Sequence, residues 1–269
     1  MLNFSVLMSV YANENPIFLK NCFDSIFNQT LMPSEIILVK DGCLNEKLDE
    51  IILGFSNIHN NLKVFGYKKN KGLGFALNFG LKKCNNDIII RCDSDDINDR
   101  NRFKLQVEFI EKNNFAIISS NIEEFNHNPG DLKRYRRVPK KNSDIQQFKF
   151  SRNPFNHMAV AFRKSIITNA GGYLDMPGYE DYYLWLRVLK NFQGFNIQKS
   201  TVNARVGNDM IGRRQGYEFM KKELKFQKTL YFDGLITKAQ FFKNSFTRII
   251  PRLFPKIILS TIYKLFLRQ

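Results

Sequence analysis

The feature that most constrains this chain is a short apolar run that turns at once into a cluster of acids. The isoleucines at 88–90 are β-branched and predict a buried strand, and Asp93, Asp95 and Asp96 follow almost directly. Carboxylates this close together at the end of a buried strand repel one another, and a divalent cation relieves that repulsion. The sequence therefore predicts a Mg²⁺ or Mn²⁺ site with open positions for substrate phosphates. The alternative is a solvated turn at 93–99 that caps a helix starting at residue 100.

A βαβ unit at the start of the chain predicts the edge of the sheet at which a ligand binds. Residues 4–10 read as a buried strand, Pro16 suits the first turn of a helix, and residues 35–40 form a second strand that ends at Asp41. The carboxyl ends of parallel strands meet at one edge, where open sheets bind nucleotides. Asp41 and Asp93 are therefore expected on the same crevice.

A basic, glycine-containing loop at 68–74 lies between two strands that end in acids. Its backbone amides and the ammonium group of Lys71 could meet a phosphate. A flexible solvated turn is the alternative for such a loop taken alone. The position of the loop in the fold favours the phosphate interpretation.

The second half of the chain adds two candidate sites. His157 could contact a metal, a phosphate or an acceptor, and a histidine satisfied by local hydrogen bonds is an equal alternative. Glu180 and Asp181 begin a helix, where acids can merely complement the helix dipole. If that helix points at the crevice, one of the two is a general base. The basic stretch at 126–141 is expected to be a loop over the crevice, with a phosphate- or RNA-binding arm as the alternative.

Composition limits the fold class, the binding partners and the cellular compartment that can be expected for the protein. The 269 residues, 43% of them apolar, suit a globular α/β domain with an extension. The formal charge of +16, concentrated in the last fifth of the chain, predicts an anionic partner. Four cysteines without C-x-x-C spacing favour small buried thiols and a reducing compartment. With no signal peptide and no long apolar run, a soluble or peripheral protein is expected.

The ordered set of motifs resembles glycosyltransferase family 2, inverting enzymes of the GT-A fold, and especially the small bacterial members that build surface polysaccharides. The matching segments are 5–11, 29–33, 35–42, 70–72, 91–96, 102–103, 156–157, 171–173, 180–185 and 213–214. The resemblance implies a GT-A catalytic domain at 1–214, with a mixed, mostly parallel central sheet flanked by helices. Residues 215–269 would then form a basic helical C-terminal extension.

The resemblance also implies roles on the donor side of the site. Tyr11 and Asp41 would line the nucleoside pocket, and Asp93 would hold the ribose or uracil. Asp95 would bind the Mn²⁺ or Mg²⁺ that bridges the diphosphate, and Asp96 would lie near the donor sugar.

On the acceptor side, the resemblance implies that Asp181 is the catalytic base, with Glu180 beside it. His157 would lie near the acceptor or the metal. Arg213 and Arg214 would offset the charge of the leaving diphosphate. A single base and no positioned carboxylate nucleophile is what an inverting displacement requires, by analogy with inverting glycosidases.

Apolar residues in the segment 252–268 fall at helical spacing with basic residues around them, which is typical of a helix in a membrane interface. The alternative is a helix packed on the catalytic domain. Because many acceptors in the resembling family are undecaprenyl-diphosphate-linked sugars, we expect a cytoplasmic protein at the inner face of the cytoplasmic membrane.

The predicted function is transfer of a hexose, with galactose the first choice, from a UDP-sugar to a saccharide or lipid-linked saccharide in O-antigen, capsule or lipopolysaccharide biosynthesis. Two alternatives are a sugar-phosphate nucleotidyltransferase and a basic nucleic-acid- or membrane-binding protein without catalysis. A nucleotidyltransferase would want a longer glycine-rich signature after the first strand, which residues 11–16 lack. A nucleic-acid partner is not expected, and oligomeric state is not encoded in any motif.

Overall fold

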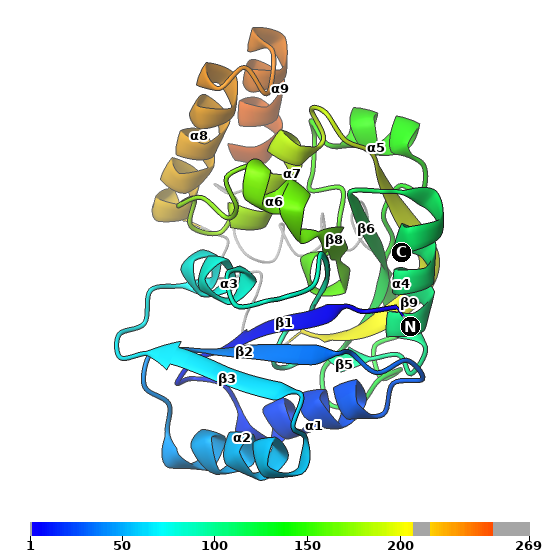
Figure 1. Ribbon diagram of the computed structural model, residues 1–269. Helices are drawn as coiled ribbons and strands as arrows, with labels where there is room; N and C mark the ends of the chain where they lie inside the picture. Colours follow the sequence, from blue (N-terminus) through cyan, green and yellow to red (C-terminus); the bar gives the residue numbers. More distant parts are fainter. Residues whose placement is uncertain (1, 207–215, 250–269) are drawn as a thin grey trace.

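A computed structural model describes residues 2–206 and 216–249 of the chain (Figure 1). Its centre is a nine-stranded sheet in the order β3-β2-β1-β4-β8-β6-β9-β5, with β7 paired to β6. The first four strands run parallel, as the βαβ reading predicted. They are β1 (Ser5–Val10), β2 (Glu35–Asp41), β3 (Leu62–Tyr67) and β4 (Ile88–Arg91).

The other half of the sheet mixes strand directions. β8 is antiparallel to both β4 and β6, while β6 and β9 are parallel to each other. Short antiparallel pairs add β5 and β7. The bounds are β5 (Ile97–Asn98), β6 (Ile117–Phe125), β7 (Arg134–Arg136), β8 (Ala161–Arg163) and β9 (Gly194–Arg205). The mixed, mostly parallel sheet predicted from the sequence is confirmed.

Successive residues of the central strands point to opposite faces of the sheet, and each face buries its own apolar core. Val6 and Met8 join the core under α1, α2 and α4, whereas Leu7 joins the core under α3, α6 and α7. A further short helix, α5, adds Ile145 to the second core. The helices are α1 (Pro16–Phe27), α2 (Glu46–Ile58), α3 (Leu73–Leu81), α4 (Arg102–Asn113), α5 (Asn142–Phe148), α6 (Lys164–Asn169) and α7 (Glu180–Val188).

Several sequence-based boundaries differ from the structure. The strand expected at 201–206 is β9, which begins seven positions earlier, at Gly194. Its first half carries the polar residues Asn196, Gln198 and Lys199, so no apolar alternation marked it. The stretch at 126–141 is not entirely a loop, because β7 lies within it and pairs with β6. The helix expected from residue 100 begins at Arg102.

The two helices that follow residue 215 pack against the rest of the structure at α7. α8 (Tyr217–Phe232) and α9 (Lys238–Ile249) form a hairpin beside α7 (Figure 1). Tyr179, at the start of α7, stacks on Phe226 of α8 at 4.3 Å between ring centroids and donates a hydrogen bond to buried Glu223 at 2.7 Å. The amphipathic segment predicted at 252–268 lies outside the described residues. Among those described, no helix has both the length and the apolar character needed to cross a bilayer.

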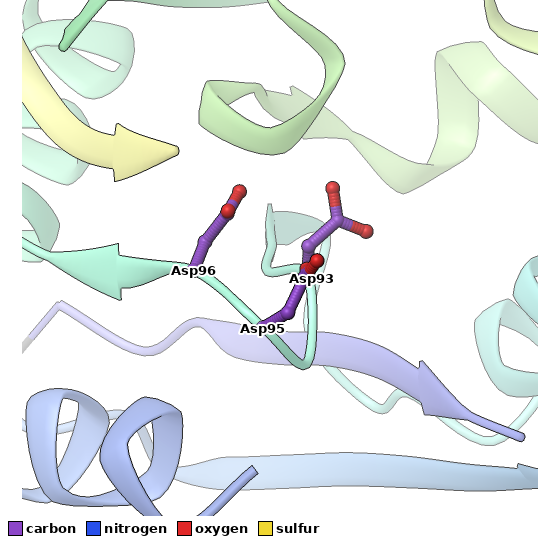
Figure 2. A group of neighbouring side chains, drawn as sticks. All are labelled: Asp93, Asp95 and Asp96. Atoms are coloured by element: carbon purple, nitrogen blue, oxygen red, sulfur yellow. The ribbon is translucent and has the colours of Figure 1, made fainter. Parts of the chain in front are cut away.

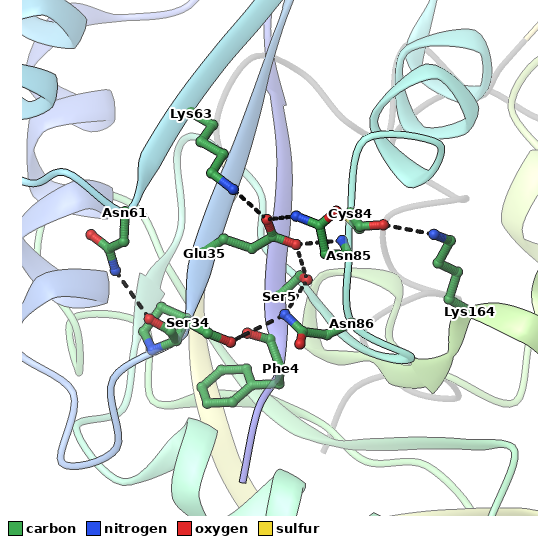
Figure 3. Close-up of polar contacts among 11 residues, drawn as sticks. Phe4, Ser5, Ser34, Glu35, Asn61, Lys63, Cys84, Asn85, Asn86 and Lys164 are labelled. Carbon is green, nitrogen blue, oxygen red and sulfur yellow. Dashed lines mark hydrogen bonds and ion pairs between the residues drawn. The ribbon is translucent and has the colours of Figure 1, made fainter. Parts of the chain in front are cut away.

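At the amino end of β2, Glu35 lies at the centre of a buried polar cluster (Figure 3). Its carboxylate accepts hydrogen bonds from the Ser5 hydroxyl, from the backbone and side chain of Asn85, and from the Lys63 ammonium group at 2.9 Å. This cluster ties β1, β2 and β3 to the segment before β4. It lies at the edge of the sheet opposite the acidic turn, because β1 to β4 are parallel and the acids follow the carboxyl end of β4.

Candidate active site

The three predicted acids form one cluster between β4 and β5. Asp93, Asp95 and Asp96 leave the turn on the same side (Figure 2), and each offers an oxygen within 4.8 Å of the others. Carboxylate oxygens are the ligands that Mg²⁺ and Mn²⁺ prefer. Among the residues that the structure describes, this is the group whose donors fit a divalent cation.

The electrostatics of the turn also fit a cation. Burial, followed by the charges of Asp93 and Glu14, raises the pKa of Asp95 to about 7. Burial and the charge of Asp95 likewise raise the pKa of Asp96 well above its ordinary value. One oxygen of Asp96 accepts a hydrogen bond from the backbone N–H of Arg205 at 2.8 Å, while the other is buried without a partner among the described residues. A buried carboxylate oxygen without a donor is costly, and a divalent cation would satisfy it.

Two arginines hold the acidic turn, and neither was predicted as a site residue. Arg91 is fully buried at the end of β4, and both of its terminal nitrogens contact the carboxylate of Asp93. Arg205, at the end of β9, donates from Nε to the carbonyl of Asp95 at 3.2 Å. Its guanidinium lies between the rings of Phe18 and Phe125, at 3.7 and 4.4 Å. The position of Arg91 at the end of an apolar strand could have indicated a buried ion pair. No local sequence pattern indicates that Arg205 contacts the acidic turn.

Asp41 organises the basic glycine loop. Its carboxylate accepts hydrogen bonds from the backbone N–H groups of Lys71 at 2.8 Å and Gly72 at 3.0 Å, and from the Tyr67 hydroxyl at 2.8 Å. The ammonium group of Lys71 lies 4.4 Å from the centroid of the Phe75 ring, so in this structure it stacks on an aromatic face. The loop and Asp41 are thus one unit at the carboxyl edge of β2, while the roles predicted for them toward a phosphate and a nucleoside stay predictions.

The close approach of the chain at this point requires a glycine. Gly42 has a φ of +92°, and a Cβ there would lie 2.8 Å from the backbone nitrogen of Asn70. Tyr11, at the carboxyl end of neighbouring β1, is 45% exposed. Its side chain is therefore accessible at the edge of the sheet to which nucleosides are expected to bind.

The start of α7 brings the two remaining acids to the same edge. Glu180 packs against the first turn of α3, where a Cβ on Gly74 would lie 3.3 Å from its Cγ. Asp181 accepts a hydrogen bond from the side-chain amide of Asn153 at 2.6 Å. Burial raises the pKa of both carboxyl groups, and the charges of Arg136 and Arg91 limit the rise at Asp181. A base with a raised pKa suits proton abstraction near neutral pH.

Arg91 interacts with both the acidic turn and the start of α7. Its side chain contacts Asp93, and its charge also opposes the rise in the pKa of Asp96 and of Asp181. The geometry can hold an anionic leaving group at one end and activate a hydroxyl at the other.

His157 is bonded within the protein. Its Nε2 lies 3.1 Å from the Tyr173 hydroxyl, and its ring meets Trp185 edge to face at 6.0 Å. Burial and the nearby Arg91 hold the pKa of His157 well below its ordinary value, so the ring is neutral. The geometry favours a histidine with a local hydrogen bond, and a role toward the acceptor stays a prediction. Arg213 and Arg214 lie outside the described residues.

An open α/β sheet with an acidic turn and further carboxyl groups at the start of α7 is typical of nucleotide-sugar-dependent transferases. Comparison with known proteins gives the family. The family model described as Glycosyl transferase family 2 matches residues 5–170, and this chain belongs to that family. The resemblance seen in the sequence is thereby confirmed. Family membership decides against the nucleotidyltransferase and the non-catalytic binding protein.

Two curated relatives match over nearly their whole length. The chain is 42% identical to a UDP-Gal:alpha-D-GlcNAc-diphosphoundecaprenol beta-1,3-galactosyltransferase of Escherichia coli, covering 99% of this chain and 97% of that protein. It is 35% identical to the amylovoran biosynthesis glycosyltransferase AmsE of Erwinia amylovora, covering 97% and 98%. Both are bacterial glycosyltransferases by name, as the sequence predicted.

A solved structure confirms the fold. The mannosyltransferase PcManGT from Pyrobaculum calidifontis, in complex with GDP-Man and Mn²⁺, superposes with a TM-score of 0.66. At 14% identity, the alignment covers 98% of this chain and 75% of that one. The GT-A architecture expected from the sequence is therefore present.

Proposed function

We propose that this protein is a metal-dependent, inverting galactosyltransferase that uses UDP-galactose and a sugar linked to undecaprenyl diphosphate as acceptor, in bacterial surface-polysaccharide biosynthesis. The observation that carries the proposal is the acidic cluster, in which one buried oxygen of Asp96 has no partner among the described residues. The raised pKa of the Asp181 carboxyl group supports it. The choice of donor and acceptor rests on the full-length similarity to the E. coli galactosyltransferase.

In this proposal the donor lies along the carboxyl edge of β1, β2 and β4. Tyr11 and Asp41 contact the nucleoside, and Asp93 holds the ribose or uracil. Asp95 holds Mn²⁺ or Mg²⁺ with Asp96 near the donor sugar. A bound divalent cation would supply positive charge against the developing charge of the departing diphosphate. Lys71, Arg213 and Arg214 add cationic side chains for the same phosphates.

Asp181 performs the proton transfer. Its carboxylate accepts the proton of the acceptor hydroxyl while that oxygen attacks the anomeric carbon from the face opposite the diphosphate. The new glycosidic bond forms as the bond to the diphosphate oxygen breaks, and UDP departs with the electron pair. One displacement inverts the configuration at the anomeric carbon. Glu180 would lie beside this base, and His157 would lie near the acceptor or the metal.

The hairpin of α8 and α9 supports a contact with an anionic membrane. Phe232, Phe242 and Phe246 are 80%, 60% and 69% exposed. Between the two helices, Tyr231 contacts Phe241 at 5.8 Å between ring centroids. Exposed lysines lie on the same two helices, at 228, 238 and 243. Aromatic and basic side chains together suit the headgroup region of an anionic leaflet, which is where an undecaprenyl-linked acceptor would be found.

Three experiments test the proposal. Release of the nucleoside diphosphate from a panel of UDP-, GDP- and dTDP-sugars, with and without Mn²⁺, should show preference for UDP-galactose when a lipid-linked N-acetylglucosamine diphosphate is present. Asp181→Asn should abolish transfer while the melting temperature is retained, and substantial transfer by this variant would remove the base assignment.

Flotation of the protein with phosphatidylglycerol vesicles should exceed its flotation with phosphatidylcholine vesicles. The double variant Phe242→Ser and Phe246→Ser should reduce the binding to phosphatidylglycerol.

A further inference from the structure

Asn153 makes a contact with Asp181 that no motif accounts for. Its Nδ2 donates a hydrogen bond of 2.6 Å to Oδ2 of Asp181. Its own Oδ1 accepts from the backbone N–H of Phe155 at 3.2 Å. Because the oxygen is committed to this N–H, the nitrogen of the amide must face the carboxylate.

The loop that carries Asn153 is anchored to the rest of the domain. The carbonyl of Pro154 accepts a hydrogen bond from the buried side chain of Asn196 in β9 at 3.0 Å. The side chain of Phe155 is fully buried and meets Trp185 of α7 edge to face, at 6.0 Å between ring centroids. The amide and the helix that bears Asp181 are thus fixed to each other by packing, which is what a preorganised site requires.

We propose that Asn153 is the positioning residue of the catalytic base: it holds Oδ2 of Asp181, fixes the plane of the carboxylate, and leaves the remaining lone pairs to accept the acceptor's proton. This inference rests on the proposed function of Asp181. Asn153 does not itself touch the reacting atoms. It acts by orienting a buried carboxylate and by donating to its ionised form.

The charges around Asp181 give the direction of the expected effect. Burial raises the pKa of this carboxyl group, while the N–H of Tyr182, the amide of Asn153 and the charges of Arg136 and Arg91 lower it. Nearby Glu180, Tyr173 and Tyr182 are the other titratable groups that interact with it. Removing the donor at 153 favours the protonated carboxyl group, so the acidic limb of the pH profile moves to higher pH.

The test compares Asn153→Ala and Asn153→Asp with the wild type in transfer from UDP-galactose to a lipid-linked N-acetylglucosamine diphosphate. A hydrogen bond to a charged group accounts for about a tenfold effect or more. We expect Asn153→Ala to lower kcat about tenfold, to leave the KM for UDP-galactose unchanged, and to move the acidic limb of kcat by about one pH unit. Asn153→Asp should be worse than the alanine variant, because a second carboxylate faces Asp181.

If Asn153 had only a structural role, Asn153→Asp should be more active than Asn153→Ala, because aspartate matches asparagine in shape and alanine leaves a gap. Asn196→Ser is the matched control: it loses a buried asparagine that holds the same loop but does not contact Asp181. It should lower the melting temperature without moving the acidic limb. An unmoved limb in folded Asn153→Ala, or a better Asn153→Asp, overturns the inference, whereas an active Asp181→Asn overturns the proposed base itself.

Discussion

Buried carboxylates lie at both ends of the parallel strands, but they differ in their hydrogen-bond donors and in the direction of their pKa shifts. At the amino end, Glu35 accepts four hydrogen bonds, one of them from an ammonium group (Figure 3). Burial alone would raise its pKa, but these donors outweigh burial and hold the pKa below its ordinary value. At the carboxyl end, Asp95 and Asp96 have raised pKa values, and one oxygen of Asp96 lacks a partner among the described residues (Figure 2).

The contrast separates a structural acid from a functional one. A fold that satisfies every oxygen of Glu35 can supply enough donors for a buried carboxylate. At the acidic turn, the unpartnered oxygen of Asp96 is available to a ligand, and perturbed pKa values of this kind gather at functional sites. The comparison predicts that neutral substitutions at the carboxyl end lower activity and metal dependence, whereas those at the amino end lower the free energy of unfolding in a pH-dependent way.

The largest expected effect is on activity at the carboxyl end. Asp95→Asn should lower transfer by about 10²–10³-fold, because the charge that holds the cation against the diphosphate is lost. The melting temperature of the metal-free protein should stay constant or rise, since an unfavourable buried charge has been removed. Steady-state kinetics with Mn²⁺ and a thermal melt in EDTA measure both. A variant that melts much earlier and still transfers sugar would make Asp95 a structural acid.

Metal and nucleotide should stabilise the wild type. A ligand at 100 times its dissociation constant raises the free energy of unfolding by about 2.7 kcal/mol, and differential scanning fluorimetry with Mn²⁺ and UDP should detect the rise in melting temperature. The rise should vanish in Asp95→Asn and persist in Glu35→Gln. Equal shifts in both variants would place the ligand elsewhere.

At the amino end, Glu35→Gln should lower the free energy of unfolding by about 1–3 kcal/mol, because buried donors lose their charged acceptor. The kcat of the folded variant should match the wild type. Since the pKa of Glu35 is lowered on folding, its contribution is present above the ordinary value of 4.5 and is lost as the pH falls through the folded value. In urea denaturation, the difference in the free energy of unfolding between the wild type and Glu35→Gln should therefore be smaller at acidic pH than at neutral pH. A constant difference would contradict the ion-pair account.

The smallest effect is expected for Ser5→Ala, which removes one of the four donors to Glu35. Because the other three remain, the cost should be about 0.5–1.5 kcal/mol in urea denaturation, with no change in metal dependence. A larger loss would mean that the hydroxyl, which also accepts from Asn86, organises more of the cluster than its bond to Glu35 suggests.

Local patterns were enough to predict one half of the site. The apolar runs of β1, β2 and β4 showed where each strand ends, so Asp41 and the acidic turn could be assigned to one edge of the sheet. Asn15 and Pro16 marked the start of α1, where the structure has the N-cap and the first helical residue. The acids at 180 and 181 marked the start of α7.

The other half depends on contacts between distant segments, which no local pattern records. Arg205 reaches the acidic turn from 110 positions away, and Asn153 reaches Asp181 across 28. The first half of β9 was missed because its polar residues show no apolar alternation, and its partners lie far away in the sequence. One of them is Asn121 of β6, whose side chain donates a hydrogen bond to the carbonyl of Gln198 at 2.8 Å. These interactions become visible only when the sheet order is known.

The most direct test of the account is calorimetric titration of UDP into the wild-type protein, in Mn²⁺ and in EDTA. If Asp95 holds a cation against the diphosphate, UDP should bind at least about tenfold more tightly with Mn²⁺, a difference of about 1.4 kcal/mol, and Asp95→Asn should lose that gain. Equal affinity in Mn²⁺ and EDTA would contradict the account, because the acidic turn would then have no part in holding the nucleotide.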